Sequence, residues 1–380
     1  MGQGVEKINN FLKDPRITEI MINGHDATFL EYGGLKSKVD VLFNEDDIKD
    51  VIEQFFTKVG KPITYYQPYG DVCLPDGSRM NIITFPLARC GTSITIRKFN
   101  RDLHSIEDLI KEGSMSQRMA DFLIACIKGK INILFSGATG SGKTTTMEML
   151  SFHIPEQERI VTIEDTAELR LHPPNLVPME TRNPDEKGTG EVTLRDLIRN
   201  ALRMRPDRII VGEVRGAEAL DMIQAMSTGH RGTLAVIHAN SPQEVNSRME
   251  TLILSSGIKL PIEEIRRMIG NTINIIVQQE RFPDGVRRIT HISEVRGIEY
   301  GEVALQDLWI FRREGKTPEG KIKGRYRTVM RNYPRFHADF QRLQLLDEKI
   351  YSDDAWKPEP KPPENNPPQE NSEGEPKEGI

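Results

Sequence analysis

The stretch GATGSGKTT, residues 137–145, constrains the fold of this chain more than any other part of the sequence. It matches the pattern G-x-x-x-x-G-K-[ST] in full, follows the short apolar segment INILFS (131–136) and precedes a segment of helical character. Glycines let successive backbone N–H groups turn toward one ligand, and the positive end of the following helix attracts an anion. A chance glycine-rich turn would lack this strand and helix. We therefore interpret residues 137–145 as a phosphate-binding loop.

The side chains of this loop predict which ligand it binds. Lys143 has the charge and reach to contact the β- and γ-phosphates of a nucleotide, and the Thr144 hydroxyl is suited to ligate Mg²⁺. The other loop residues that we expect to contact the nucleotide are Gly137, Thr139, Gly140, Ser141, Gly142 and Thr145. The sequence therefore predicts that the chain binds ATP together with Mg²⁺.

The composition limits the class of protein. The 380 residues are enough for two domains, and a content of 37% hydrophobic and 28% charged residues is ordinary for a globular protein. The formal net charge of −5 gives no overall basic excess, which argues against nucleic acid as the main partner.

The cysteines and the apolar segments predict a cytoplasmic protein. Cys73, Cys90 and Cys126 are widely separated and form no CxxC pair, which disfavours a disulfide framework and a zinc site and fits a reducing compartment. No apolar run approaches membrane-spanning length, and the N-terminal stretch lacks the apolar core of a signal peptide. If the chain works at a membrane, we expect partners to hold it there.

Changes in composition along the chain predict its domain organisation. We expect an α+β domain at residues 1–100, a polar linker at 101–116, an α/β domain at 117–350 and a disordered acidic tail at 351–380. The tail prediction rests on residues 357–380, which hold seven prolines, six acids and almost no apolar residue. Such a segment cannot bury enough apolar surface to fold. A tail without function is the simpler interpretation, and a docking or regulatory tail is the alternative.

The first domain contains mainly strand signals. Residues 17–31 alternate in polarity around an Asn-Gly pair, which predicts a hairpin. Residues 46–60 have apolar positions at helical spacing and end at a glycine. A Pro-Asp-Gly turn divides residues 72–85 into two strand-like runs, and residues 93–99 form a further strand.

The second domain alternates strands with helices. The expected strands are residues 131–136, 159–165, 208–213 and 232–239, and helices follow them near residues 142–153, 193–204, 215–229 and 241–254. This alternation predicts a parallel sheet with helices on both faces. The pairs Ser105/Asp108 and Thr193/Asp196 predict helix caps, and Ser241, Pro242 and Glu244 predict a further capped start.

Acidic residues and a histidine follow three of these strands. The segment TIEDTAE contains Glu164, Asp165 and Glu168, and RIIVGE ends at Glu213. In a parallel sheet the strand ends face the ligand, so both acid clusters could converge on the γ-phosphate, one near magnesium and one at the attacking water. His238 ends a strand and could sense the γ-phosphate, although a buried structural histidine is a serious alternative. His230, in a loop, is a weaker candidate.

Four segments resemble a known family in both order and spacing. GATGSGKTT, TIEDTAE, MRPDRIIVGEVRGAEA and STGHRGTLAVIHANSP are similar to the Walker A, Asp-box, Walker B and His-box segments of the secretion ATPase superfamily of type II and type IV secretion and type IV pili. The segments ITEIMING, LPDGSRMNI and PLARCGTSITIRKF, with the later EVRGIEYGEVALQDLWIF, resemble the CpaF-type branch, which serves tight-adherence (Tad) pili. The resemblance covers residues 10 to 345, but the four-cysteine insertion of many type II ATPases is absent.

The resemblance implies a fold, an assembly and residue roles. It implies a RecA-like P-loop NTPase domain behind a smaller PAS-like α+β domain, a homohexameric ring, and ATP between the two domains. Glu168 would polarise the attacking water, Glu213 would act through Mg²⁺ and His238 would sense the γ-phosphate. The ring would sit in the cytoplasm, peripheral to the inner membrane, and drive pilus assembly or protein secretion through platform proteins of that membrane.

In this superfamily, arginines of the first domain reach the nucleotide. Arg79, Arg89 and Arg97 fall in the matching segments, and Arg97 in SITIRKF is the strongest candidate. Structural salt bridges are an equal alternative for Arg79 and Arg89. Arg203 and Arg215 flank the Walker B segment and could line the site.

Other functions compete with a pilus motor. An ATPase of a conjugative type IV secretion system would share the same motifs. A nucleotide-gated scaffold would bind ATP and scarcely hydrolyse it, but the paired acids Glu168 and Glu213 argue against this. The net charge and the lack of an aromatic-basic groove motif disfavour a helicase, and the lack of a lid disfavours a small-molecule kinase.

Overall fold

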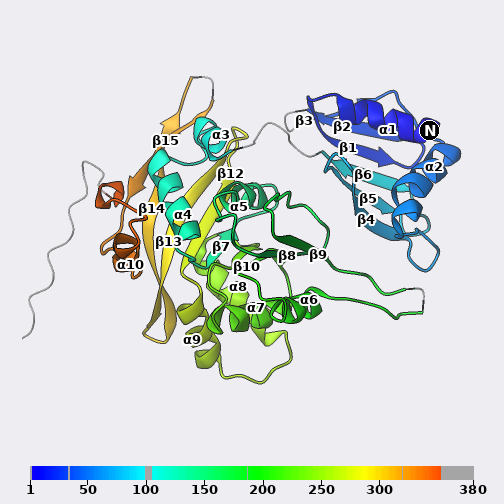
Figure 1. The fold of residues 1–380 in the computed structure, drawn as a ribbon. Coiled ribbons are helices and arrows are strands. Elements are labelled where there is room, and N and C mark those ends of the chain that lie inside the picture. Colours follow the sequence, from blue (N-terminus) through cyan, green and yellow to red (C-terminus); the bar gives the residue numbers. More distant parts are fainter. Residues whose placement is uncertain (1, 33–34, 99–104, 186, 319, 352–380) are drawn as a thin grey trace, which may run out of the picture.

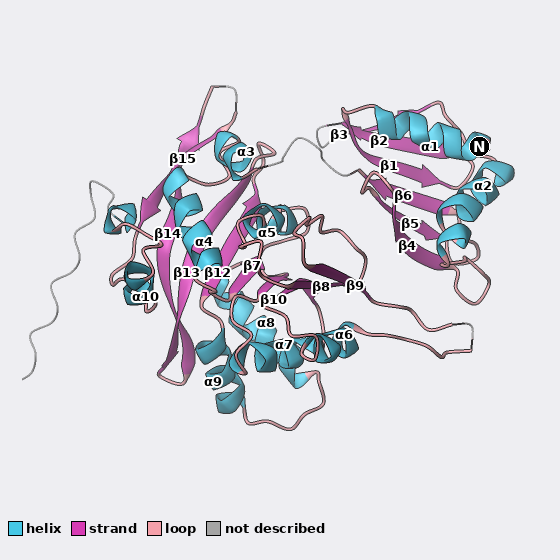
Figure 2. Cartoon of the chain, in the orientation of Figure 1, coloured by secondary structure: helices cyan, strands magenta, loops and turns pink. Residues whose placement is uncertain are grey.

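The computed structural model describes residues 2–32, 35–98, 105–185, 187–318 and 320–351. These residues form two β-sheets, each packed against helices (Figure 1), and Figure 2 distinguishes the two kinds of element by colour. Residues 99–104 of the predicted first domain and linker, and nearly all of the predicted tail, lie outside the described residues.

The first sheet is antiparallel and has the strand order β3-β2-β1-β6-β5-β4. Its elements are α1 (Gln3–Lys13), β1 (Ile17–Asn23), β2 (Ala27–Tyr32), β3 (Leu35–Val39), α2 (Glu45–Phe55), a 3₁₀ turn (Thr57–Val59), β4 (Tyr69–Cys73), β5 (Arg79–Ile83) and β6 (Ser93–Arg97). Alternate strand residues form one core with apolar residues of α1 and α2, such as Ile8 and Val51. These residues form the small α+β fold that the sequence predicts.

The predicted hairpin at residues 17–31 is present as β1 and β2. Its turn places Gly24 at a φ of 63°, and a Cβ there would also collide with the carbonyl oxygen of Cys90. The sequence did not predict β3, because its residues LKSKV are mostly exposed and show no alternation. Lysines on such an edge strand oppose pairing with other chains.

The second sheet is mixed and has the strand order β15-β14-β13-β12-β7-β11-β10-β8-β9. Its strands are β7 (Ile133–Ser136), β8 (Ile160–Glu164), β9 (Leu176–Glu180), β10 (Arg208–Val214), β11 (Leu234–Ile237), β12 (Ile275–Arg281), β13 (Arg287–Glu299), β14 (Glu302–Lys316) and β15 (Ile322–Thr328). The strands from β12 to β9 in this order run parallel, as the sequence predicts for β7, β8, β10 and β11, whereas β9 and β12 were not predicted. Antiparallel β13, β14 and β15 extend one edge, which the sequence analysis did not foresee.

Helices cover both faces of the second sheet. One face carries α3 (Ile106–Lys111), α4 (Gln117–Lys128) and α5 (Lys143–Ser151), and the other carries α6 (Leu194–Ala201), α7 (Glu218–Ser227), α8 (Pro242–Leu254) and α9 (Ile262–Thr272). Ile133 and Phe135 of β7 pack into the first of these cores, and Leu134 between them packs into the second. Helix α10 (His337–Arg342) and a 3₁₀ turn (Glu348–Tyr351) complete the described chain.

The predicted capping boxes at the starts of α6 and α8 differ in outcome. At α6, the Thr193 hydroxyl accepts from the Asp196 N–H and the Asp196 carboxylate accepts from the Thr193 N–H, which confirms the predicted capping box. At α8, Ser241 caps the helix as predicted. The Glu244 carboxylate instead accepts from the backbone and side-chain N–H groups of Asn240, so the predicted second half of that box is wrong.

Part of the predicted linker, residues 101–116, belongs to the core of the second sheet. Ser105 caps α3 through the Asp108 N–H, as the sequence predicts. Ile106 and Leu109 of this helix are 2% and 3% exposed and join the core that contains α4 and α5. A capped amphipathic turn therefore begins the second domain rather than bridging two domains.

Replacing Leu109 by alanine is expected to lower the free energy of unfolding by about 2–5 kcal/mol, because the change removes a buried side chain and leaves a cavity. Urea denaturation followed by circular dichroism measures this effect. Lys111→Ala, on the same helix with a side chain that is 77% exposed, is the matched control and is expected to change stability by less than about 0.5 kcal/mol. Equal, small effects of both changes would contradict the burial of α3.

Candidate active site

The candidate site lies at the carboxyl edge of the parallel strands in the second sheet. The phosphate-binding loop follows β7, His238 follows β11, and Glu213 is the last residue but one of β10. These three strands are neighbours and run parallel, so their ends lie side by side. Glu164 ends the next strand, β8, and leads into the loop that carries Glu168.

Glycines give the phosphate-binding loop its course. Gly137, Gly140 and Gly142 have φ values of 152°, 76° and 96°, a region that residues with side chains rarely adopt. Gly142 immediately precedes α5, so the loop ends at a helix N-terminus, where an anion is stabilised.

Two side chains of the loop are buried in it. Lys143 is 5% exposed, and its Nζ donates to the carbonyl oxygen of Ala138 at 2.8 Å. The Ser141 hydroxyl is buried and has no hydrogen-bond partner in the described part of the chain. Because a buried polar group without a partner is costly, this loop fits a ligand that offers oxygen acceptors, such as a phosphate.

Strands β12 and β13 support the loop from behind. The Thr146 hydroxyl donates to Oε1 of Gln279 at 3.0 Å, and Nε of Arg287 donates to the carbonyl oxygen of Gly140 at 3.1 Å. A Cβ on Gly142 would lie 2.9 Å from atoms of both supporting side chains. The sequence analysis missed Gln279 and Arg287, because they lie 133 and 147 residues from their partners in a segment without a motif.

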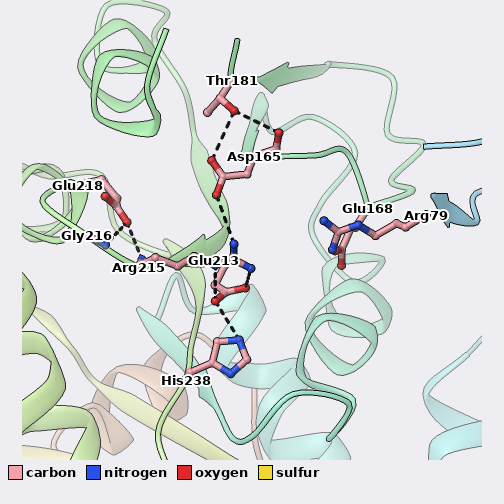
Figure 3. Close-up of polar contacts among 9 residues, drawn as sticks. All are labelled: Arg79, Asp165, Glu168, Thr181, Glu213, Arg215, Gly216, Glu218 and His238. Atoms are coloured by element: carbon pink, nitrogen blue, oxygen red, sulfur yellow. Dashed lines mark hydrogen bonds and ion pairs between the residues drawn. The ribbon is translucent and has the colours of Figure 1, made fainter. Parts of the chain in front are cut away.

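Glu213 is the centre of a polar network (Figure 3). His238 Nε2 lies 2.9 Å from Oε1 of Glu213, and Arg215 Nε lies 2.7 Å from the same oxygen. Arg215 also lies 3.9 Å from the Asp165 carboxylate, which links the ends of β8 and β10. The Glu218 carboxylate accepts the backbone N–H groups of Arg215 and of the next residue, which fixes the turn after β10.

Burial and neighbouring charges set the protonation of this network. Burial lowers the pKa of Lys143 to about 8, Glu213 opposes this change, and Arg97 adds to it. Burial alone would raise the pKa of Glu213, but hydrogen bonding with Arg215 and the charge of His238 hold it below its ordinary value. Burial and the Lys143 charge lower the pKa of His238. At pH 7 the site therefore presents an ammonium, a carboxylate and a mostly neutral imidazole.

Glu168 belongs to a separate group of contacts. It forms an ion pair with Arg79 of β5, in the first domain (Figure 3). The buried Glu164 carboxylate accepts the backbone N–H groups of Glu168 and Leu169 at 2.9 and 3.0 Å, and burial raises the pKa of Glu164 to about 8. Glu168 and Glu213 are thus held by different partners, Arg79 for the first and Arg215 with His238 for the second.

Two of the three candidate arginines of the first domain face the second domain. Arg79 and Arg97 lie opposite each other on β5 and β6, so both project to the same side of the sheet. A Cβ built on Gly140 would lie 3.8 Å from Nη2 of Arg97, which places this guanidinium beside the phosphate-binding loop. Arg79 contacts Glu168 instead, whereas Arg89 is exposed and forms no hydrogen bond or ion pair with any described residue.

Two weaker candidates lie at the wrong ends of their strands. Arg203 precedes β10 and is exposed, at the opposite end of the strand from Glu213. His230 similarly precedes β11, at the opposite end from His238. Since a strand of seven residues such as β10 spans about 23 Å, Arg203 lies far from Glu213 within one chain.

The donors near the loop fit Mg²⁺ better than a transition metal. Thr144 is half-buried in the first turn of α5, and the Glu213 carboxylate is bonded to Arg215 and His238. Among the described residues, no group of three or more His, Cys, Asp or Glu could hold a metal ion alone. A hydroxyl and one carboxylate suit Mg²⁺, which takes its other oxygens from phosphates and water.

Comparison with known proteins identifies the family. The family model described as type II/IV secretion system protein matches residues 3–291, so the chain belongs to this family. The chain is 41% identical over 233 residues to an uncharacterized protein of Methanocaldococcus jannaschii, which covers 59% of this chain and 32% of that protein. It is 31% identical over 325 residues to the type IV secretion system protein VirB11 of Bartonella quintana, covering 76% and 91% of the two chains.

The fold is also similar to that of a solved structure. The crystal structure of the pilus retraction motor PilT with bound ADP matches with a TM-score of 0.58 at 18% identity, covering 89% of this chain and 87% of that one. The match supports the two-domain α/β fold. Within the described residues, every helix is too short or too polar to cross a membrane.

Sulfate binding to the full chain is expected to weaken about tenfold between pH 7 and pH 9, because Lys143, with a pKa of about 8, loses its proton in this range. Sulfate keeps the same charge throughout, and isothermal titration calorimetry measures the affinity. Lys143→Arg is the control, since a guanidinium stays charged and should give a flat profile. An equal slope in both proteins would assign the effect to another group, such as Glu164.

Proposed function

We propose that the chain is an ATP-hydrolysing motor of a secretion or pilus-assembly system. The observation that carries this proposal is that Arg97 of the first domain and Lys143 of the second lie at one phosphate-binding loop. A ligand in the loop would touch both domains, so its binding and the loss of its γ-phosphate would change their preferred arrangement.

In this proposal, residues of the chain hold and polarise the phosphates. The Lys143 ammonium and the loop N–H groups bind the β- and γ-phosphates, and Thr144 and Glu213 hold Mg²⁺. The metal, when bound, neutralises part of the phosphate charge. His238 donates Nε2–H to Glu213, so a neutral ring has no second N–H for a phosphate; we propose that it takes up a proton on Nδ1 and donates to the γ-phosphate when the nucleotide is bound.

We propose that Glu168 orients the attacking water, and that Arg79 decides when the Glu168 carboxylate is free to do so. In this structure the Glu168 carboxylate is paired with Arg79 and so is not free to bind water. A guanidinium binds phosphate oxygens as well as carboxylate oxygens through the same planar fork. We therefore propose that the nucleotide draws Arg79 toward its phosphates and frees Glu168, which couples hydrolysis to movement of the first domain.

We further propose a cytoplasmic ring of six copies that acts on platform proteins of the inner membrane. The support for this assembly is membership of the type II/IV secretion family together with the four motif segments in family order. A motor whose site uses two domains can pass their relative motion to a partner that contacts either one.

The finer assignment is the Tad pilus branch, and a type IV secretion ATPase is the second candidate. The first-domain segments ITEIMING, LPDGSRMNI and SITIRKF favour the pilus branch. The 31% identity to VirB11 across 91% of that protein favours the secretion candidate. Purification of the full chain with its membrane partners separates them: pilus platform proteins support the first candidate, and components of a DNA- or protein-transfer channel support the second.

The ATPase rate per subunit is expected to rise cooperatively with protein concentration, because ring assembly would complete the sites. Lys143→Ala and Glu213→Gln are each expected to reduce kcat at least about 100-fold, since they remove phosphate and metal interactions. Steady-state phosphate release measures both effects. ATP binding without hydrolysis in the unmodified chain would instead support a nucleotide-gated scaffold, and a rate per subunit that is independent of concentration would contradict completion by the ring.

Arg287→Gln is expected to weaken MgATP binding about tenfold, because the loop loses its hydrogen bond at Gly140 and a positive charge beside it. Calorimetry with a slowly hydrolysed ATP analogue measures this affinity, and Arg287→Lys should restore part of it. Arg313→Gln, an exposed change in the same sheet, is the matched control. Unchanged affinity in Arg287→Gln would show that this arginine does not position the loop.

A further inference from the structure

The β14–β15 hairpin carries a basic surface that the proposed nucleotide site does not use. Residues 312–327, here called the basic hairpin, contain seven basic residues and two acids. The basic residues are Arg312, Arg313, Lys316, Lys321, Lys323, Arg325 and Arg327, and the side chains of all seven are exposed. Such a concentration of one charge at the edge of a sheet predicts an acidic partner.

The two faces of the basic hairpin differ in chemistry. Phe311 and Tyr326 lie opposite each other and pack with ring centroids 5.1 Å apart, and the Tyr326 hydroxyl donates to the carbonyl oxygens of Gly113 and Ser114. This face is therefore turned toward the connection between α3 and α4. Because side chains alternate along a strand, the opposite face presents cations to solvent. They are Arg312, Lys323, Arg325 and Arg327.

The cations on this outer face have little compensation within the chain. Arg312 and Arg325 are directly opposite in the register, where like charges repel. Glu314 lies 3.4 Å from Arg325 and 4.0 Å from Arg327, whose side chains are still 69% and 44% exposed. Within the described residues, the other five cations of the basic hairpin have no ion pair. The face is thus left with an excess of positive charge.

We propose that the acidic segment 352–380 of the same chain docks on the outer face of the basic hairpin. This segment holds eight acids, three lysines and seven prolines, so its charge is opposite to that of the hairpin. Its seven prolines have no backbone N–H to donate, so we expect it to contact the hairpin through its carboxylates and not as an added strand.

The place where the described chain ends supports this occupant. The ring of Tyr351 stacks on Trp309 with centroids 6.0 Å apart, and Trp309 pairs with Thr328, the last residue of β15. The described chain therefore ends beside the strand pair that carries the cations. Arg327, which precedes Thr328 in β15, is on the outer face, so the described chain ends close to the outer cations.

The length of the segment is sufficient for this path. The 29 residues from 352 to 380 would span roughly 90 Å at the rise of a polyproline II chain. Strand β15, with seven residues, is about 23 Å long, and it is the outermost strand of the sheet. Docking needs no movement of either domain and is independent of the nucleotide site. The basic hairpin would then accept an external acidic surface only when that surface displaces the segment.

Zero-length carbodiimide cross-linking of the full chain tests the proposal, because it joins lysines to carboxylates in direct contact. We expect cross-links between Lys321 or Lys323 and acids of the segment at low salt, and a loss of about fivefold in 0.5 M salt, where exposed charges are screened. The triple change Arg312→Gln, Arg325→Gln and Arg327→Gln keeps these lysines and should cause a similar loss.

The matched control is the triple change Arg231→Gln, Arg248→Gln and Arg267→Gln, which removes three exposed arginines elsewhere. It should leave the cross-link yield unchanged. Absence of the cross-links at low salt, or equal yields in both triple variants, would overturn the proposal. Cross-links found mainly between ¹⁴N- and ¹⁵N-labelled copies in a mixture would also overturn it, because they would place the segment on a second copy.

A second measurement separates the segment from a membrane as the natural occupant. Changing the eight acids of the segment to their amides should increase sedimentation of the full chain with phosphatidylserine-containing vesicles at least about threefold, because the hairpin is uncovered. The arginine triple variant should abolish this gain. Equal vesicle binding by the unmodified chain and the amide variant would show that the segment does not cover the hairpin.

Discussion

The active site depends on keeping a positive charge buried where an anion is expected. Lys143 is 5% exposed at the N-terminus of α5, an end that itself repels cations. The Ala138 carbonyl and the nearby Glu213 charge compensate it in part, yet burial still brings its pKa down to about 8. Arg97 and Arg287 add further positive charge at Gly140. A phosphate group would relieve these unfavourable contacts at once, which explains why the loop, the first domain and the antiparallel extension all meet here.

The mixed sheet gives the site its support. The parallel strands bring the loop, Glu213 and His238 to one edge, and this part follows from alternation of strands and helices. The antiparallel strand β13 returns beside β12 and delivers Arg287 to the carbonyl of Gly140. The phosphate-binding loop is therefore held by Arg287, which comes from the antiparallel part of the sheet and not from the parallel strands that carry the motifs. This support explains how a glycine-rich loop keeps one conformation around buried polar groups.

The sequence predicted the loop, a parallel sheet and the residues at the strand ends, because each depends on local pattern. The meeting of His238 with Glu213 follows from the rule that neighbouring parallel strands end together. The sequence did not predict the contact of Arg287 with the loop or the ion pair of Arg79 with Glu168, because both arise from packing between distant segments. Long antiparallel strands such as β13 and β14 were also not predicted. Consecutive residues at their centres are buried, so apolar and polar residues do not alternate there as they do in a strand with one exposed face.

The register of two short strands in the first domain sets how the second domain can move. Arg79 and Arg97 face each other on β5 and β6, so hydrogen bonds of the sheet fix the spacing of their backbones. One reaches the loop after β8 and the other the loop after β7. The two arginines therefore fit one separation between these two loops. A change in that separation must break the contact of Arg79 with Glu168 or move Arg97 away from Gly140. A shift of β6 by one residue would turn Arg97 to the other face, but it would also expose Ile94 and Ile96, which are fully buried, so the core of the first domain holds the two arginines in register.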